Sequence, residues 1–299
     1  MRYTIKEFQA EYPDDEACLE QIMKEQYGGT QIGCPGCGAD SKFTRITKRR
    51  AYACQWCGHH IYPCTGTIFE KSSTALTKWF MAMYLFTSTR HGVAAKELER
   101  QLGVTYKTAW RMAHELRKLM ASADFQGPMK GHIEIDETLI GGKKRRVPGE
   151  KNRKPGRIPG HHAIVFGMVE RDGVIRAGTI PDVKQTTVEP IILTNVQRGS
   201  TISTDELKSY ADLGRSPYNH GTVDHSQEQW VSGIHHTNTI EGHWAQLKRS
   251  IRGTHVHVSH KHLWKYVSEF SYRRNNRHSH RDMFNRLVDA FSLPLLQET

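Results

Sequence analysis

Two closely spaced pairs of cysteines constrain the first part of this chain more than any other feature. They occur in CPGC (Cys34 and Cys37) and in CQWC (Cys54 and Cys57), separated by residues 38–53. Each C-x-x-C turn directs two thiolates at one ion, and the intervening segment has the length of a hairpin that brings the pairs together. A redox motif or a pair of disulfides is the alternative. Four thiolates complete a closed tetrahedral shell, so the spacing predicts a structural Zn²⁺ ion in a zinc ribbon.

The charge of the chain indicates the class of its partner. Lys and Arg total 42 against 31 Asp and Glu, which gives a formal net charge of +11 over 299 residues. This balance suits a polyanion, although a basic surface that only aids solubility is the alternative. The sequence contains neither a long apolar run nor the basic-then-apolar start of a secretory signal. We therefore expect a cytoplasmic protein that does not contact membranes.

The segment between the cysteine pairs predicts a first surface for nucleic acid. It interleaves cations with Phe43 and Tyr52 along the expected hairpin, and this pattern suits phosphate contacts. The cations of this hairpin are Lys42, Arg45, Lys48, Arg49 and Arg50.

Helical periodicity follows the ribbon. An amphipathic helix is expected in SSTALTKWFMAMYLFTSTRHG, then a short helix to Leu102, a turn at Gly103 and a second helix opening at Thr105. This order is typical of a helix-turn-helix, whose second helix enters a major groove, although a plain helical hairpin has the same pattern. The groove-facing candidates are Tyr106, Lys107, Thr108 and Arg111.

The second half of the chain alternates strand and helix patterns. Three strands are expected in HIEIDETLIGG, HHAIVFGMVER and GVIRAGTIPD. A helix, the short strand TISTD, the helix ELKSYADLG and a strand in TVDHSQEQWV follow, and further helices end the chain. This order is the layout of an RNase H-like domain, in which helices flank a central mixed sheet.

Three acids occupy distinct positions in this layout. Asp136 lies within the first strand, Asp205 ends the fourth strand, and Glu241 lies on a later helix. Each has a structural alternative: a solvated strand acid, a cap for the helix that begins after Asp205, and a capping box of Asn238 with Glu241. Their joint occurrence in this order favours a shared site.

These motifs resemble those of the DDE transposases of bacterial insertion sequences. The resemblance is to the branch with an N-terminal zinc ribbon and a helix of the pattern N-x-I-E-x-x-W-x-x-L-K, which reads NTIEGHWAQLK here. It spans nearly the whole chain and implies that Asp136, Asp205 and Glu241 are the catalytic, metal-binding acids. Lys248 also matches the pattern, and Asn238 is a further candidate in the third motif.

The chemistry of DNA strand cleavage and transfer accounts for the acids independently. Two Mg²⁺ ions about 3.5–4 Å apart, or Mn²⁺ in their place, activate the attacking oxygen and stabilise the leaving one. Asp and Glu supply the hard oxygen ligands that such ions prefer. Lys248 follows Glu241 by about two helical turns, so both side chains share one face and Lys248 can neutralise a nearby phosphate.

The predicted fold class is multidomain α+β, with a zinc ribbon and helix-turn-helix followed by an RNase H-like α/β domain. We expect the ribbon segment at 1–70, the helix-turn-helix region at 71–122, a linker at 123–131 and the catalytic domain at 132–299. A basic insertion at 143–160, rich in Gly and Pro, is expected to clamp DNA. Its leading cations are Lys143, Lys144, Arg145 and Arg146.

The sequence thus predicts a bacterial transposase that binds the terminal inverted repeats of an insertion sequence and cleaves and joins DNA. Double-stranded DNA is the expected partner, bound by a homo-oligomer that is nucleoid-associated when on DNA. One alternative is a DNA-binding regulator with a non-catalytic RNase H-like domain, which the intact acids argue against. Another is a structure-selective nuclease, which the sequence does not separate from a transposase.

Overall fold

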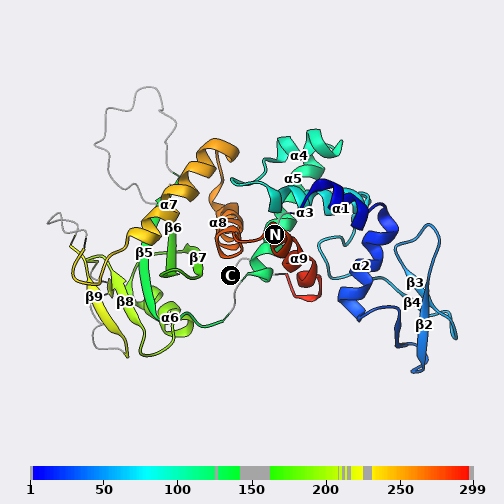
Figure 1. The fold of residues 1–299 in the computed structure, drawn as a ribbon, viewed down its shortest axis with the longest axis horizontal. Coiled ribbons are helices and arrows are strands. Elements are labelled where there is room, and N and C mark those ends of the chain that lie inside the picture. The colour runs from blue at the N-terminus through cyan, green and yellow to red at the C-terminus, as the bar shows by residue number, and fades with distance from the viewer. Residues whose placement is uncertain are drawn as a thin grey trace. The chain divides into compact units, whose positions relative to one another are not determined.

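The chain divides into two compact units in a computed structural model (Figure 1). Unit 1 comprises Met1–Asp124 together with Asn276–Thr299, and unit 2 comprises Phe125–Asn275. The structure describes residues 3–124, 127–141, 162–207, 209–210, 213, 217–224 and 231–295.

Helices around an aromatic core make up most of unit 1. They are α1 (Ile5–Glu11), α2 (Asp15–Tyr27), α3 (Leu76–Ser88), α4 (Ala95–Leu102), α5 (Tyr106–Ala123), α9 (His280–Asp289) and the 3₁₀ helix η4 (Ala290–Ser292). Side-chain caps set the start of the first two. Thr4 and Glu7 form a capping box before α1, and Asp14 accepts two backbone N–H groups at the start of α2.

The helices α9 and η4 pack into this core. The Phe284 ring on α9 lies 5.4 Å from that of Tyr3 and 5.9 Å from that of Phe8, between centroids. Phe291 lies 5.0 Å from Phe69 in the same way. The described residues of Asn276–Thr299 therefore belong to unit 1, whereas the sequence prediction included them in a catalytic domain at 132–299. The reason is that their aromatic side chains are buried against rings from the first third of the chain.

A small antiparallel sheet in unit 1 carries the cysteine pairs. Its strands, in the order β1-β2-β3-β4, are β1 (Gln31–Gly33), β2 (Asp40–Arg45), β3 (Tyr52–Cys54) and β4 (His60–Ile61). Phe43, Tyr52 and Ile61 turn their side chains inward and are buried. The predicted hairpin between the cysteine pairs is formed by β2 and β3.

The helix pair α4 and α5 is joined by a tight turn. Gly103 ends α4 in the left-handed conformation with φ of 58°, which glycine adopts without strain. Thr105 then caps α5 by accepting the N–H of Thr108. The two helices and the turn lie where the sequence predicted them, and their role in DNA recognition stays a prediction.

Unit 2 is built on a five-stranded mixed sheet with the order β7-β6-β5-β8-β9. The strands are β5 (His132–Ile140), β6 (Ala163–Glu170), β7 (Ile175–Ile180), β8 (Thr201–Thr204) and β9 (Asn219–Thr222). β5, β6 and β7 pair antiparallel, whereas β8 and β9 run parallel to β5. The first four strands lie within the predicted stretches. The fifth was predicted in TVDHSQEQWV but ends at Thr222, where that stretch begins.

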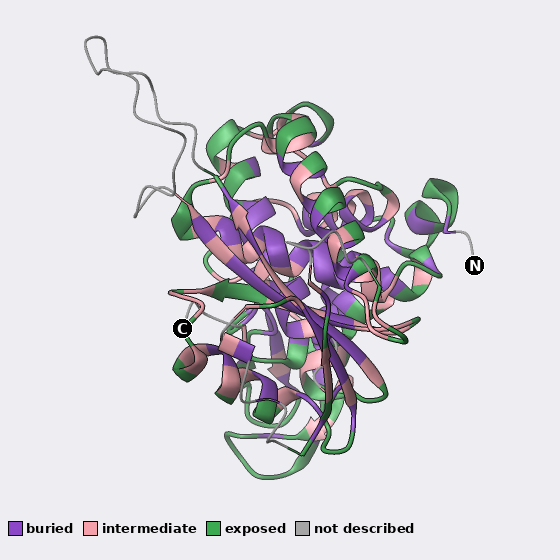
Figure 2. Cartoon of the chain, turned by 90° about the vertical axis from the view of Figure 1, so that its left-hand side faces the viewer, coloured by how far each residue is buried: buried purple, intermediate pink, exposed green. Residues whose placement is uncertain are grey.

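Helices cover both faces of this sheet. Val188 and Ile192 of α6 (Gln185–Asn195) pack with Ile133 and Ile135 on one face. The other face is covered by α7 (Asn238–Ser250) and α8 (His260–Asn275), whose apolar residues pack on β6 and β7. A short π-helical turn, η3 (Ile251–His255), continues α7. Figure 2 shows the buried residues following the strands of the sheet.

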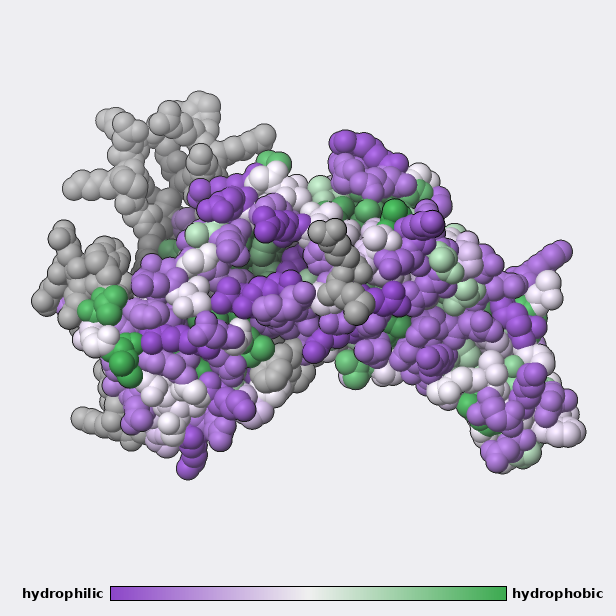
Figure 3. Space-filling view, viewed as in Figure 1, coloured by the Kyte–Doolittle hydropathy of each residue, from purple (hydrophilic) through white to green (hydrophobic). Residues whose placement is uncertain are grey.

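One face of the molecule is coloured by hydropathy in Figure 3. The face drawn in Figure 3 is largely hydrophilic, with small and scattered apolar patches. In the part of the chain that the structure describes, no helix has the length and apolar content that crossing a bilayer requires.

Candidate active site and zinc site

The four cysteines of the ribbon converge on one point. Sγ of Cys34 lies 3.6 Å from Sγ of Cys57, and Sγ of Cys37 lies 4.0 Å from Sγ of Cys54. A tetrahedral zinc ion with Zn–S bonds of about 2.3 Å holds its sulfurs about 3.8 Å apart. The arrangement therefore fits one structural zinc ion with a closed thiolate shell.

Matching turns hold the two cysteine pairs. In the first pair, the N–H of Gly36 points at Sγ of Cys34 at 3.4 Å, and Gly38 adopts φ of 74° to close the turn. The equivalent N–H, sulfur and left-handed glycine in the second pair belong to Trp56, Cys54 and Gly58. N–H groups aimed at sulfur favour the thiolate form that a metal requires.

Parallel pairing in unit 2 brings two of the three predicted acids together. The register of β5 and β8 aligns Glu134 with Ser203. One pleat further along, Asp136 lies on β5 beside Asp205, which directly follows β8. Because side chains alternate between the faces of a sheet, both carboxylates project from the same face.

Negative charge surrounds Asp136, which is half-buried. Burial and then the carboxylates of Glu137 and Asp205 raise the pKa of Asp136 to about 7. Trp244 of α7 counteracts this shift by donating its indole N–H to Oδ2 of Asp136 at 2.9 Å. Neighbouring carboxylates repel one another, and a bound divalent cation relieves that repulsion.

A glycine makes room for the indole beside Asp136. Gly167 on β6 pairs with Asp136 across the antiparallel ladder. A Cβ atom at this position would lie 2.5 Å from Cη2 of Trp244. The missing side chain thus lets α7 approach the sheet closely enough for the Trp244–Asp136 hydrogen bond.

Gly167→Ala is expected to lower the free energy of unfolding by about 1–3 kcal/mol, because the added methyl group must displace the indole. Gly178→Ala is the matched control, since a Cβ there on β7 meets no atom within 4 Å. Urea unfolding of the full-length variants measures both free energies. Equal stability of the two variants would contradict the close packing of Trp244 on Gly167.

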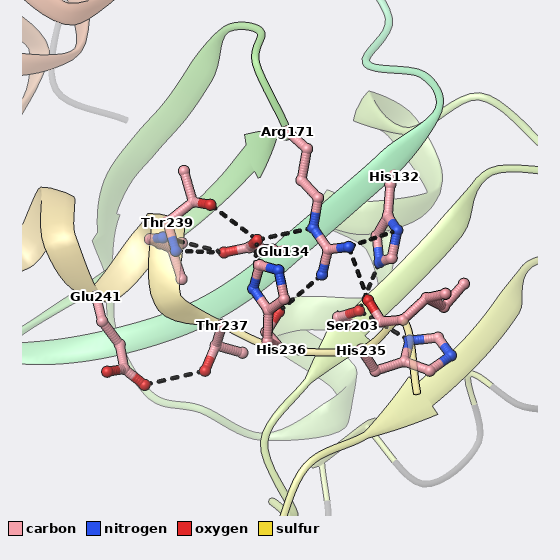
Figure 4. Close-up of polar contacts among 11 residues, drawn as sticks. His132, Glu134, Arg171, Ser203, His235, His236, Thr237, Thr239 and Glu241 are labelled. Atoms are coloured by element: carbon pink, nitrogen blue, oxygen red, sulfur yellow. Dashed lines mark hydrogen bonds and ion pairs between the residues drawn. The ribbon is translucent and has the colours of Figure 1, made fainter. Parts of the chain in front are cut away.

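Glu241 lies on the helix that packs on β5, but its carboxylate is engaged elsewhere. Oγ1 of Thr237 donates to Oε1 of Glu241 at 3.0 Å, as Figure 4 shows. Among the described residues, the four cysteines form the one set of three or more metal-ligating side chains whose donor atoms all lie within 4.8 Å. The structure thus brings Asp136 and Asp205 together, and Glu241 does not complete such a set with them.

Two other predicted residues lie near the ends of α7. Lys248 is half-buried in its last turn, about two turns beyond Glu241 and on the same side. Asn238 is exposed as the first helical residue, and the N-cap is Thr237. The capping box of Asn238 with Glu241, considered as an alternative above, is therefore absent from this described helix.

Some of the predicted DNA-contacting residues of unit 1 form contacts within the protein, and others are exposed. Three arginines donate to backbone carbonyls within unit 1, namely Arg45 to Ile46, Arg50 to Ser72 and Thr74, and Arg111 to Glu70. The ammonium group of Lys96 lies 5.0 Å from the ring centroid of Tyr106. The other four described cations of the predicted set are exposed: Lys42, Lys48, Arg49 and Lys107. Lys143, Lys144, Arg145 and Arg146 lie outside the described residues.

Sequence analysis did not identify a partly buried polar network at the start of α7. It consists of His132, Glu134, Arg171, Ser203 and His235 (Figure 4). Trp244 was part of the quoted helix pattern but had no assigned role. The alternation of side chains along the strand could have indicated one member of this network. Glu134 lies two residues before Asp136 and therefore on the same face of the sheet.

Comparisons with known proteins agree with the division of the chain into two units. The family model of the ISXO2-like transposase domain matches residues 128–275, and that of the transposase zinc-ribbon domain matches residues 13–60. A protein of the transposable element ISH50 from Halobacterium salinarum is 29% identical over 257 residues, which cover 81% of this chain and 85% of that protein. A transposase-like protein of Haemophilus influenzae is 29% identical over 97 residues, which cover 32% of this chain and 77% of that protein.

Solved structures show a more distant likeness. The Mos1 strand transfer complex aligns with 12% identity and a TM-score of 0.30, covering 74% of this chain and 79% of that chain. A pre-cleavage Mos1 transpososome aligns with 13% identity and a TM-score of 0.27, covering 74% and 80%. The two family models carry the assignment: the chain belongs to the ISXO2-like transposases, with a transposase zinc ribbon at its N-terminus.

Proposed function

We propose that this protein is a metal-dependent transposase that binds the terminal inverted repeats of an insertion sequence, cleaves DNA strands there and joins them to a target. The observation that carries the proposal is the pair of carboxylates of Asp136, on β5, and Asp205, directly after the neighbouring parallel strand β8. The helix that bears Glu241 is packed against the same sheet through Trp244. The strand order and the helices on both faces support an RNase H-like domain.

The donor set suits Mg²⁺ or Mn²⁺. Carboxylate oxygens are hard ligands, and Asp136 and Asp205 project side by side from one face of the sheet. Divalent ions held there would activate an attacking oxygen and stabilise the leaving oxygen of the phosphodiester. Trp244 fixes the orientation of the Asp136 carboxylate by its hydrogen bond to Oδ2. Glu241 can join this set once its side chain leaves Thr237.

The positive charge of the chain and the helix α5 are the proposed determinants of DNA binding. The net charge of +11 suits a polyanionic partner. The exposure of Lys107 at the start of α5 suits contacts in a major groove, and the exposure of Lys42, Lys48 and Arg49 on the ribbon suits contacts with phosphates. Phosphate contacts would position the protein on DNA, and side chains of α5 would contact the base edges that specify the sequence. A homo-oligomer on DNA is part of the same proposal.

The test is an assay with a labelled duplex that ends in the element's terminal repeat, incubated with the full-length protein, Mg²⁺ and a target plasmid. Cleavage at the repeat end and covalent joining to the plasmid are expected. Cleavage without joining would indicate a structure-selective nuclease, and binding without cleavage would indicate a regulator. Either result would overturn the proposed strand transfer.

A further inference from the structure

The first turn of α7 is capped by a residue from another element. α7 has no side-chain cap of its own at Thr237. Instead, Oε2 of Glu134 on β5 accepts the backbone N–H of Thr239 at 2.8 Å and that of Ile240 at 3.2 Å. The hydroxyl of Thr239 donates to Oε1 at 2.9 Å. A carboxylate at a helix N-terminus satisfies unpaired N–H groups and interacts favourably with the helix dipole.

Arg171 ties this carboxylate to the segment that leads into α7. The Glu134 side chain is fully buried, and its Oε1 lies 3.0 Å from Nε of Arg171. The same guanidinium donates to the carbonyl of Ile234 at 2.7 Å and to that of His236 at 3.4 Å. Figure 4 shows Glu134 between the guanidinium and the start of the helix. One ion pair therefore holds both the helix N-terminus and the chain that enters it.

A chain of hydrogen bonds anchors this segment to the parallel strands. The guanidinium of Arg171 has only donors, so Nδ1 of His132, 3.1 Å away, is the acceptor and Nε2 carries the proton. Nε2 then donates to Oγ of Ser203 at 2.7 Å, and Ser203 donates to Nδ1 of His235 at 2.8 Å. The His235 ring lies directly over Gly221 of β9, where a Cβ would overlap it. The segment is thereby fixed to β5, β8 and β9.

We propose that Glu134 and Arg171 are positioning residues for the metal site, and this inference rests on the proposed function. Glu134 and Asp136 share one face of β5, two residues apart, so the strand that carries one metal-binding acid also sets where α7 begins. Trp244 and Glu241 follow on that helix, in its second turn and at the end of its first. The ion pair therefore places both side chains relative to Asp136.

Net stabilisation alone does not account for such a pair. Taking the fully buried Glu134 carboxylate out of water costs much of what its attraction to the partly exposed guanidinium returns, so such an ion pair is a weak contributor to stability. In several proteins such a buried charge instead selects one arrangement among several of similar energy, and we infer that role here. The arrangement selected here is the axial position of α7 against β5, on which the approach of Glu241 to Asp136 and Asp205 depends.

The test compares Glu134→Gln with Glu269→Gln. Glu269 is another fully buried carboxylate in unit 2 and pairs with Arg273 at 2.8 Å within α8, which makes Glu269→Gln a matched control. Two quantities are measured on the full-length protein: the dissociation constant for Mn²⁺, from the electron paramagnetic resonance signal of the free ion, and the Mn²⁺ concentration for half-maximal cleavage. Glu134→Gln is expected to raise both by about tenfold or more, as loss of a residue that orients metal ligands does. Glu269→Gln is expected to stay within about twofold of the parent.

Arg171→Lys is the second variant, because it keeps a charge near Glu134 but loses the contacts to the carbonyls at 234 and 236. Like Glu134→Gln, it is expected to weaken Mn²⁺ binding. If Glu134→Gln does not fold, the Mn²⁺ binding of Arg171→Lys alone tests the inference. Parent-like Mn²⁺ binding in a folded Glu134→Gln or Arg171→Lys protein would overturn the inference, as would failure of both to fold. Asp136→Asn run in parallel separates the two proposals, since parent-like cleavage by that variant would refute the proposed function itself.

Discussion

Asp136→Asn and Asp205→Asn proteins are expected to bind element-end DNA as the parent does and to cleave it about a thousandfold more slowly or worse. An amide keeps the size of the carboxylate but lacks the charge that holds a divalent ion. Metal catalysis of this kind supplies several kcal/mol, and each 1.4 kcal/mol or so corresponds to a factor of ten in rate. Cleavage and joining of a labelled end, measured beside a binding assay, give both quantities. DNA binding is preserved because the predicted DNA-reading helix α5 belongs to unit 1 and both acids belong to unit 2.

Asp182→Asn is the matched control for these variants. Asp182 lies before α6, and its carboxylate accepts hydrogen bonds from the N–H of Lys184 and the hydroxyl of Thr187. An asparagine oxygen at this position can still accept both. Cleavage at the parent rate is therefore expected for this variant. Parent-like cleavage by Asp205→Asn would show that the acids are misassigned. If Glu241→Gln alone stays active, Asn238 becomes the leading candidate for the third position.

Local patterns explain why the ribbon and most of the sheet were predictable. Each cysteine pair needs only its own turn and a following glycine to direct two sulfurs at one ion, so the spacing was sufficient. Strand β6 buries apolar residues over most of its length, and β5 alternates Ile133 and Ile135 with polar residues, so both patterns can be read directly from the chain. The neighbouring positions of Asp136 and Asp205 then follow from the parallel register.

The features that the sequence did not predict depend on pairing between distant segments of the chain. Glu134 and Arg171 are 37 positions apart and meet only because β5 and β6 form a hairpin. The four residues of β9 have no apolar alternation, and the strand exists because it pairs with β8, where His220 also contacts Thr204 at 2.9 Å. In the same way, nothing in the residues around Phe284 indicates that they pack on Tyr3 and Phe8 rather than on the preceding sheet.

Loss of one ribbon cysteine is expected to remove the zinc ion and unfold β1 to β4. Cys54 is buried, and its Sγ lies 3.0 Å from Oγ of Ser41 and 4.0 Å from Sγ of Cys37, so Cys54→Ser removes a central ligand. Strands of two to six residues bury too little apolar surface to fold alone. Structural zinc in small domains contributes an apparent 10–16 kcal/mol or so, as much as the whole stability of many domains.

Metal analysis and limited proteolysis of the full-length protein test this expectation. The parent should contain about one zinc ion per chain and resist cleavage between Gln31 and Ile61, because a closed four-thiolate site binds one ion. Cys54→Ser should contain none and be cut there. Cys18→Ala is the control, since Cys18 is a buried free thiol on α2 outside the four-cysteine set, and zinc should be retained. Because Arg50 donates from the ribbon to the carbonyls of Ser72 and Thr74, unfolding of the ribbon should also loosen the segment before α3. A Cys54→Ser protein that keeps both its zinc and its protease resistance would refute the assignment of the ribbon as a zinc-dependent fold.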